Sequence, residues 1–245
     1  MLLRKIKEMA LDLIDEEFTL IDFSFALPYT YVLIEGERGK SLGVAMTLPE
    51  EVGRYRVSIT EPSLEGLIER LDSINIIERT LGLAAVNALS QYHLDTSNVP
   101  DVDVTRLLTE DIKKVAVIGN MPPVVDELRK RFEVLVFERN PKLWDRDTYS
   151  DALEYWLLPE VDAVIVSGSA ILNGTLDMIL DRAKRAEIIV LTGPTAQLLP
   201  DFLRGSGVTH LAAMKVVDVE KALTRLKLGS FRGFEEGSRK YVVEV

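Results

Sequence analysis

The chain has 245 residues, of which 47% are hydrophobic and 28% charged, and 39 acidic against 29 basic side chains give a net charge of −10 at pH 7. This composition predicts a folded globular protein and excludes a disordered or fibrous one. The negative excess disfavours nucleic acid and anionic membrane surfaces as partners, since the sequence shows no local basic patch. The absence of cysteine excludes disulfides, thiolate metal sites and a cysteine nucleophile.

The first hundred residues predict an α+β unit. The apolar spacing of residues 1–18 indicates an amphipathic helix and not a signal peptide. Two extended stretches, 30–36 and 40–48, are joined by the turn-forming GERGK and predict a hairpin. Helical spacing returns at 64–71 and again at 73–92.

The remainder of the chain alternates apolar strands with helices. The segment 93–110 is rich in turn formers and acids, and it marks the predicted boundary between a domain of residues 1–108 and one of 109–245. Alternation of this kind predicts a Rossmann-like α/β domain with a parallel sheet. The predicted strands are 113–119, 133–138, 162–168, 187–193 and 209–217.

Composition also bears on source and location. Only two glutamines and six asparagines occur, a scarcity of heat-labile amides that favours a thermophilic source. Apolar runs are shorter than the roughly 20 residues of a membrane span, and no targeting segment is visible, so we expect a cytoplasmic protein. A homodimer is the default expectation for a soluble chain.

Ligands of an open parallel sheet bind outside the carboxyl ends of its strands, and the loops at those ends are rich in small polar residues. Any single asparagine or glycine has turn formation as an alternative explanation. Taken together they predict a polar pocket for a small, oxygen-rich ligand. The predicted ligand-binding residues in these loops are Gly119, Asn120, Asn140, Ser167, Gly168, Ser169, Asn173, Gly174, Thr175, Gly193, Pro194 and Thr195.

Within this set, Asn173-Gly174-Thr175 precedes a predicted helix. The pair Asn173-Gly174 suits a left-handed turn, with Thr175 as the helix N-cap. The free N–H groups at such a helix start also predict a seat for an anion or carboxylate.

A dinucleotide is disfavoured as the ligand. The first strand should lead into G-x-G-x-x-G, and only Gly119 is present before two prolines. Glu138 does end the second strand 19 positions later, where a ribose-binding acid would stand. Nucleotide-type ligand binding without the glycine motif therefore remains an alternative.

Groups suited to catalysis are sparse. His93 and His210 fall in the boundary segment and at the start of the fifth strand, away from the expected cleft, and we interpret both as structural. Glu35, Asp145 and Asp147 are candidates for cation ligands or acid–base groups, but each is also explained as a solvated surface charge. Glu138 closes an otherwise apolar strand and is the candidate catalytic acid or base.

Several of these segments resemble a known family. The stretches TLGLAAVNAL (80–89), VAVIGNMP, VFERNP, SGSAILNGT and LTGPTAQLLP are similar to those of the uncharacterised DUF364 family, associated with heavy-metal chelation, and its DUF4213 N-terminal domain. The resemblance implies an enolase N-terminal-like α+β domain followed by a Rossmann-like one. It also implies a site in the cleft between the two domains, and this adds Asn87, in TLGLAAVNAL, to the predicted ligand-binding residues. Trp144 stands where family members typically have glycine, so Trp144 either packs or covers a planar ligand.

Three functional hypotheses follow. The first is binding, or metabolism, of a metal-chelating small molecule or metal chelate. Without cysteine, either the small molecule brings most of the donors to a divalent metal, or oxygen atoms of the protein do so, with Glu138 and Asp145 as candidates. The second is an enzyme acting on a small anionic substrate, with Glu138 as acid or base and the loop backbones polarising a carbonyl. The third is an interaction protein with a vestigial cleft.

Overall fold

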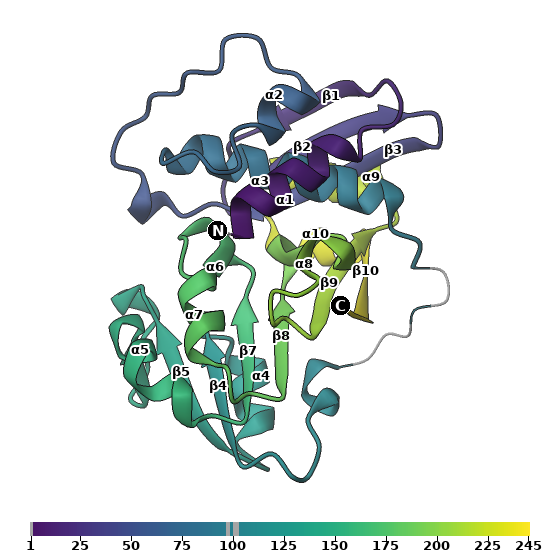
Figure 1. The fold of residues 1–245 in the computed structure, drawn as a ribbon. Helices are drawn as coiled ribbons and strands as arrows, with labels where there is room; N and C mark the ends of the chain where they lie inside the picture. Colours follow the sequence, from purple (N-terminus) through teal and green to yellow (C-terminus); the bar gives the residue numbers. More distant parts are fainter. Residues whose placement is uncertain (1, 97–98, 100–102) are drawn as a thin grey trace.

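A computed structural model describes residues 2–96, 99 and 103–245, and contains two β-sheets (Figure 1). The predicted boundary segment 93–110 includes residues 97, 98 and 100–102, which lie outside the described residues. Among the described residues, no helix is both long and apolar enough to span a membrane.

The first sheet is antiparallel and has the order β1-β2-β3. Its strands are β1 (Thr19–Ser24), β2 (Tyr29–Gly36) and β3 (Gly39–Met46). The predicted hairpin is confirmed, since β2 and β3 pair from Tyr29 opposite Met46 to Gly36 opposite Gly39. Strand β1 was not predicted, because it is a half-exposed edge strand without a continuous apolar run.

Three helices belong to the first part of the chain: α1 (Leu2–Asp12), α2 (Leu64–Ile68) and α3 (Ile76–His93). All three match predicted helical segments. Helix α3 is buried on nearly every side, and it lies directly on β3. A side chain at Gly43 would meet the backbone of Ala84 and Ala88, so glycine is required for this close approach.

The second sheet has seven strands in the order β10-β9-β8-β7-β4-β5-β6, and all are parallel except β10. The five predicted strands are confirmed as β4, β5, β7, β8 and β9, whereas β6 and β10 are additions at the two edges. The bounds are β4 (Lys114–Ile118), β5 (Glu133–Glu138), β6 (Thr148–Ser150), β7 (Ala163–Ser167), β8 (Ile188–Thr192), β9 (His210–Val216) and β10 (Ser238–Glu244).

Helices connect these strands and cover the sheet. Leu128 of α4 and Ile179 of α7 are fully buried beside the sheet, and α7 also packs on α5 (Figure 1). The helices are α4 (Pro122–Leu128), α5 (Glu154–Leu157), α6 (Ser169–Leu172), α7 (Leu176–Arg182), α8 (Pro200–Leu203), α9 (Val219–Lys227) and α10 (Phe231–Glu236).

The two sheets are built into shared cores. In β2, Val32 and Ile34 face the core formed with α1 and α3, while Tyr31 and Leu33 face a second core. That second core includes Met214 of β9 and residues of α9 and α10, so helices from the end of the chain cover the outer face of the first sheet. The architecture is therefore mixed α/β with interlocked parts, and the division at residue 108 stays a prediction.

Candidate functional site at the carboxyl ends of the parallel strands

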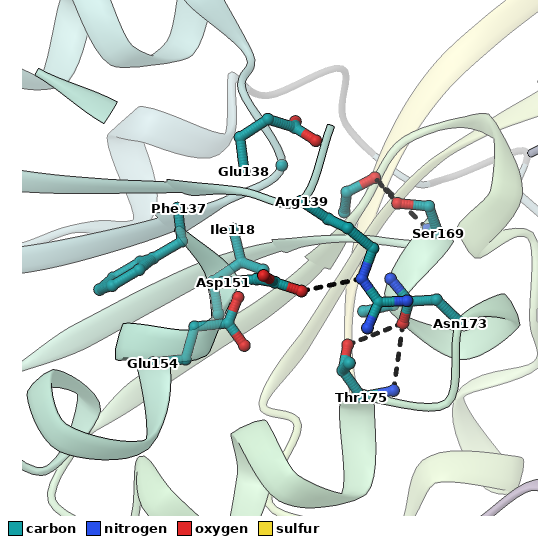
Figure 2. Close-up of a pocket in the computed structure, with 12 residues that line it drawn as sticks. Ile118, Phe137, Glu138, Arg139, Asp151, Glu154, Ser169, Asn173 and Thr175 are labelled. Carbon is teal, nitrogen blue, oxygen red and sulfur yellow. Dashed lines mark hydrogen bonds and ion pairs between the residues drawn. The ribbon is translucent and has the colours of Figure 1, made fainter. Parts of the chain in front are cut away.

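A cavity opens where β4 and β7 lie side by side. The chain runs from β4 outward to β5 on one side and from β7 to β8 on the other, so this is the topological switch point at which open α/β sheets bind ligands. The cavity measures about 50 Å³, or about 350 Å³ including its solvent-open mouth (Figure 2). Its lining residues are Ile118, Gly119, Phe137, Glu138, Arg139, Asp151, Glu154, Ser167, Ser169, Ala170, Asn173 and Thr175.

Glu138, at the end of β5, holds two loops together. Its Oε2 accepts a hydrogen bond from the Asn120 N–H at 2.8 Å, and its Oε1 accepts one from the Asn140 N–H at 2.8 Å. The carboxylate thus fixes the loops that leave β4 and β5. Both Asn120 and Asn140 therefore contribute their backbone to this arrangement, and neither lines the cavity.

Arg139 is the cation of the cavity wall, and carboxylates surround it. Its Nε donates to Asp151 at 2.8 Å, and its Nη1 donates to Glu51 of the first part of the chain at 2.7 Å. Glu51 does not line the cavity, so the ionised groups of the wall itself are the carboxylates of Glu138 and Asp151 and the guanidinium of Arg139. The cavity wall is therefore net negative.

Glu154, in the first turn of α5, is a buried acid. Its side chain is 2% exposed, and its Oε2 is buried without a hydrogen-bond partner among the described residues. Burial, with the negative charge of Asp151, raises the pKa of Glu154 to about 8, although Arg139 acts in the opposite direction. At neutral pH its carboxyl group is therefore mostly protonated.

Two hydroxyl groups on the opposite wall, those of Ser169 and Thr175, donate their hydrogens within the protein. Ser169 Oγ donates to Ser167 Oγ at 3.0 Å. Thr175 donates to Asn173 Oδ1 through both its N–H, at 3.1 Å, and its hydroxyl, at 2.8 Å. Ser169 and Thr175 consequently face the cavity mainly with oxygen lone pairs.

The predicted anion seat at Asn173-Gly174-Thr175 has both donors of Thr175 occupied. Gly174 is left-handed, with φ of 77°, as expected. Thr175 occupies the N-cap position of α7 but makes no capping hydrogen bond. Its N–H is held by Asn173, so the turn closes on itself and does not present that donor to a ligand.

The exit glycines serve the sheet and its packing. The N–H groups of Gly119, Gly168 and Gly193 donate to carbonyls of Phe137, Thr192 and Ala212, each on a neighbouring strand. A side chain at Gly168 would come within 2.8 Å of the Ala196 nitrogen. The missing side chain at Gly168 therefore lets two backbone segments approach each other closely.

Two predicted residues lie in the contact between the two parts of the chain. Asn87 is fully buried, and its Nδ2 donates to the carbonyls of Val44 at 2.7 Å and Thr195 at 3.0 Å. Thr195, beside Pro194 in a short 3-10 helix, accepts from the Met46 N–H at 2.9 Å. Neither Asn87 nor Thr195 lines the cavity at the strand ends.

Gln91 and Gln197 extend this contact. Gln197 Oε1 accepts from the Val44 N–H at 2.9 Å, and Gln197 Nε2 donates to the Met214 carbonyl at 2.6 Å. Gln91 Nε2 donates to the Gln197 carbonyl at 3.1 Å. We call the group of Asn87, Gln91, Thr195 and Gln197 the amide seam.

Asp145 and Trp144 lie outside the cavity. Asp145 Oδ1 accepts hydrogen bonds from the Thr148 hydroxyl at 2.6 Å and the Asp147 N–H at 3.0 Å, and these contacts hold the pKa of Asp145 below its usual range. Trp144 is 44% exposed, and its Nε1 donates to the Glu138 carbonyl at 2.8 Å. Both residues shape the loop after β5.

Sequence reasoning missed Arg139, Asp151 and Glu154. A signal was present for Glu154, because it is an acid inside the apolar stretch ALEYWLL, where a buried helix face is expected. Arg139 directly follows Glu138 at the end of a strand. The rule that ligands bind at the carboxyl ends of parallel strands, which selected Glu138, could therefore have selected Arg139 as well. Asp151 lies beyond the short strand β6, which the sequence did not reveal.

The described residues do not form a metal centre. Among residues 2–96, 99 and 103–245, no group of three or more histidine, cysteine, aspartate or glutamate side chains could hold a metal ion. His93 contacts Arg38, and His210 contacts Thr209 at the amino end of β9, far from the strand ends that form the cavity. The oxygen donors predicted together, Glu138 and Asp145, are not both in the cavity wall.

Family models match most of the chain. Residues 102–244 match DUF364 and residues 7–90 match DUF4213, both described as "Putative heavy-metal chelation". The chain belongs to the DUF364 family. It is 50% identical to an uncharacterised protein of Methanocaldococcus jannaschii, over all of this chain and 98% of that protein.

Solved structures agree with this assignment. A crystal structure of a DUF364 protein of unknown function from Pyrococcus horikoshii is 64% identical over the whole of both chains, with a TM-score of 0.98. A second DUF364 structure, from Desulfitobacterium hafniense, shares the fold at 20% identity, with a TM-score of 0.79 over 99% of this chain and 98% of that one. The archaeal relatives are proteins of thermophiles.

Proposed function

We propose that this DUF364 protein binds a small, donor-rich polar molecule in the cavity at the ends of β4, β5 and β7. One observation carries the proposal: the wall is net negative, because the carboxylates of Glu138 and Asp151 line it with a single guanidinium, that of Arg139. A ligand with N–H groups or a positive charge complements such a wall.

The family description of heavy-metal chelation fits this site if the metal enters already bound to a small molecule. Because the described residues offer no three-ligand cluster, the small molecule itself would supply most donors to the metal. An amine chelate of a divalent metal is cationic, whereas a citrate complex is anionic. The wall charge favours the first kind of complex over the second.

Isothermal titration calorimetry with three probes tests this proposal: nickel ion alone, the nickel–ethylenediamine complex, and the nickel–citrate complex. We expect one site for the ethylenediamine complex, with at least tenfold weaker binding of the other two. The Asp151→Asn variant should weaken binding about tenfold, while the exposed control Asp181→Asn should not change it. Failure of every probe to bind, or tightest binding of free nickel, contradicts the proposal.

An enzyme acting at the same cavity is the second candidate. Glu154 favours it, since a carboxylic acid with a pKa of about 8 is suited to donate a proton near neutral pH. In that case Glu154, and not Glu138, is the catalytic acid, because both oxygens of Glu138 accept backbone hydrogen bonds. Turnover lost in Glu154→Gln but retained in Glu138→Gln would support this role.

A further inference from the structure

Glu154 has no protein partner that explains its burial. Its side chain is 2% exposed, and its Oε2 has no hydrogen-bond partner in the described part of the chain. A buried polar group without a partner costs about 1–3 kcal/mol, and an unpaired charge costs more. Figure 2 shows Glu154 at the cavity wall beside Asp151, so the missing partner is to be sought in the cavity.

Three charged groups act on Glu154, and they lie just before α5 and at the end of β5. Asp151 precedes the helix, and Glu138 and Arg139 end β5. Arg182 of α7 is directed elsewhere, because its Nε donates to the Tyr155 carbonyl at 2.9 Å and its guanidinium lies 4.2 Å from the Tyr155 ring centre. Arg139 is shared between Asp151 and Glu51.

These groups make a net negative cavity wall that includes one neutral acid, Glu154. We propose that Glu154 is the counter-ion for a positively charged group of the ligand, and that it releases its proton to solvent when that group enters the cavity. The exchange balances, since one cationic group replaces one proton and the carboxylate forms an ion pair with it. This inference rests on the proposed function and specifies an organic cation, such as an ammonium group, as the feature recognised.

Burial and charge explain why the exchange occurs on binding. Without a ligand, desolvation and the charge of Asp151 keep the pKa of Glu154 near 8, so the group is neutral at pH 7. An ammonium group within about 4–6 Å favours the ionised form and lowers the pKa of the acid below 7. Binding at pH 7 is therefore accompanied by release of close to one proton.

Three probes of nearly equal size separate charge from shape: ethanolamine, ethylene glycol and glycolate are cationic, neutral and anionic at pH 7. Calorimetry in phosphate and in HEPES buffer measures proton release, because the two buffers differ in ionisation enthalpy and neither carries a net positive charge that would compete with the probe. We expect ethanolamine to bind with release of close to one proton, and the other two probes to bind at least tenfold more weakly.

Glu154→Gln keeps the size of the side chain and a neutral donor, so the fold should be retained. We expect this variant to bind ethanolamine at least tenfold more weakly and to release no proton. Glu160→Gln is the matched control, because Glu160 is a largely exposed acid a few residues away, and it should behave as the wild type.

Carboxyl carbon NMR of the free protein gives a readout that needs no ligand. A resonance that titrates near pH 8 and is lost in Glu154→Gln supports the inference, while titration of Glu154 below pH 5 overturns it. Ethanolamine binding without proton release, unchanged affinity in Glu154→Gln, tighter binding of glycolate, or no binding of any probe also overturns it. Binding of nickel–ethylenediamine without proton release would overturn this inference and leave the proposed function standing.

Discussion

The amide seam and the cavity at the strand ends use polar side chains in opposite ways. In the seam, neutral amides donate to and accept from backbone groups of both parts of the chain, as Gln197 does with Val44 and Met214. In the cavity, acids such as Glu154 and Asp151 line a space that opens to solvent. An oxygen without a partner among the described residues occurs in both places, at Glu154 Oε2 in the cavity and at Asn87 Oδ1 and Gln91 Oε1 in the enclosed seam. The comparison separates polar groups that stabilise the fold from polar groups available to a ligand.

The largest expected effect concerns the seam. Gln197→Ala would leave the Val44 N–H and the Met214 carbonyl unpaired inside the core, and the free energy of unfolding should fall by about 4 kcal/mol. Urea denaturation measures this loss. The exposed control Lys184→Ala should change stability by less than about 0.5 kcal/mol, and an equal loss in both variants would contradict a special role for the seam.

A pH-dependent effect is expected at Glu154. Its pKa is raised from 4.5 to about 8 in the folded protein, so the folded state binds more protons than the unfolded state between these values. This contribution to stability is fully present below pH 4.5 and is lost as pH rises through 8.

Relative to wild type, Glu154→Gln should therefore gain about 3 kcal/mol between pH 4.5 and 8.5, taking about 1.4 kcal/mol for each unit and allowing for partial hydration of the cavity. Unfolding curves at a series of pH values check the sign. A difference between the two proteins that does not change with pH would contradict the buried, protonated acid.

A smaller effect is expected at Glu138. This residue lines the cavity, but like the seam amides it also forms hydrogen bonds with backbone groups. In Glu138→Gln, only one oxygen remains to accept from Asn120 and Asn140, so one N–H loses its acceptor at a cost of about 2 kcal/mol. Thermal unfolding of the wild type and the variant measures this loss of stability. Full stability together with lost ligand binding would instead assign Glu138 to the ligand.

The smallest effect concerns Trp144. Trp144→Phe keeps an aromatic ring but removes the hydrogen bond to the Glu138 carbonyl, and the side chain is 44% exposed, so we expect a loss of about 0.7 kcal/mol. The affinity of the variant for the nickel–ethylenediamine complex should change less than twofold. A tenfold loss of affinity would show that Trp144 covers the ligand.

The sequence predicted the parallel sheet because buried strands are continuous apolar runs, as in KKVAVIG. It did not predict β6 and β10, since β6 has three residues and β10 begins with the polar stretch SRK. Edge strands bury only part of their surface, so their sequences lack the continuous apolar signal.

For the site, the rule of strand ends selected six cavity residues: Gly119, Glu138, Ser167, Ser169, Asn173 and Thr175. The same rule also selected Thr195, which contacts Met46 across the amide seam, because sequence does not show which first-sheet strand faces a given loop. The roles of the individual residues in ligand binding stay predictions.

The expected homodimer also stays a prediction, and light scattering would test it.

Helix α1 begins the described chain but is bound to its second part. The Leu2 N–H donates to Asp177 at 2.9 Å, and Lys5 Nζ donates to the Arg204 carbonyl at 2.6 Å. During synthesis, α1 therefore leaves the ribosome well before its partners exist. Docking of this helix has to await α7 and α8, so an isolated fragment of residues 2–93 should expose apolar surface and require a chaperone or its missing half to remain in solution.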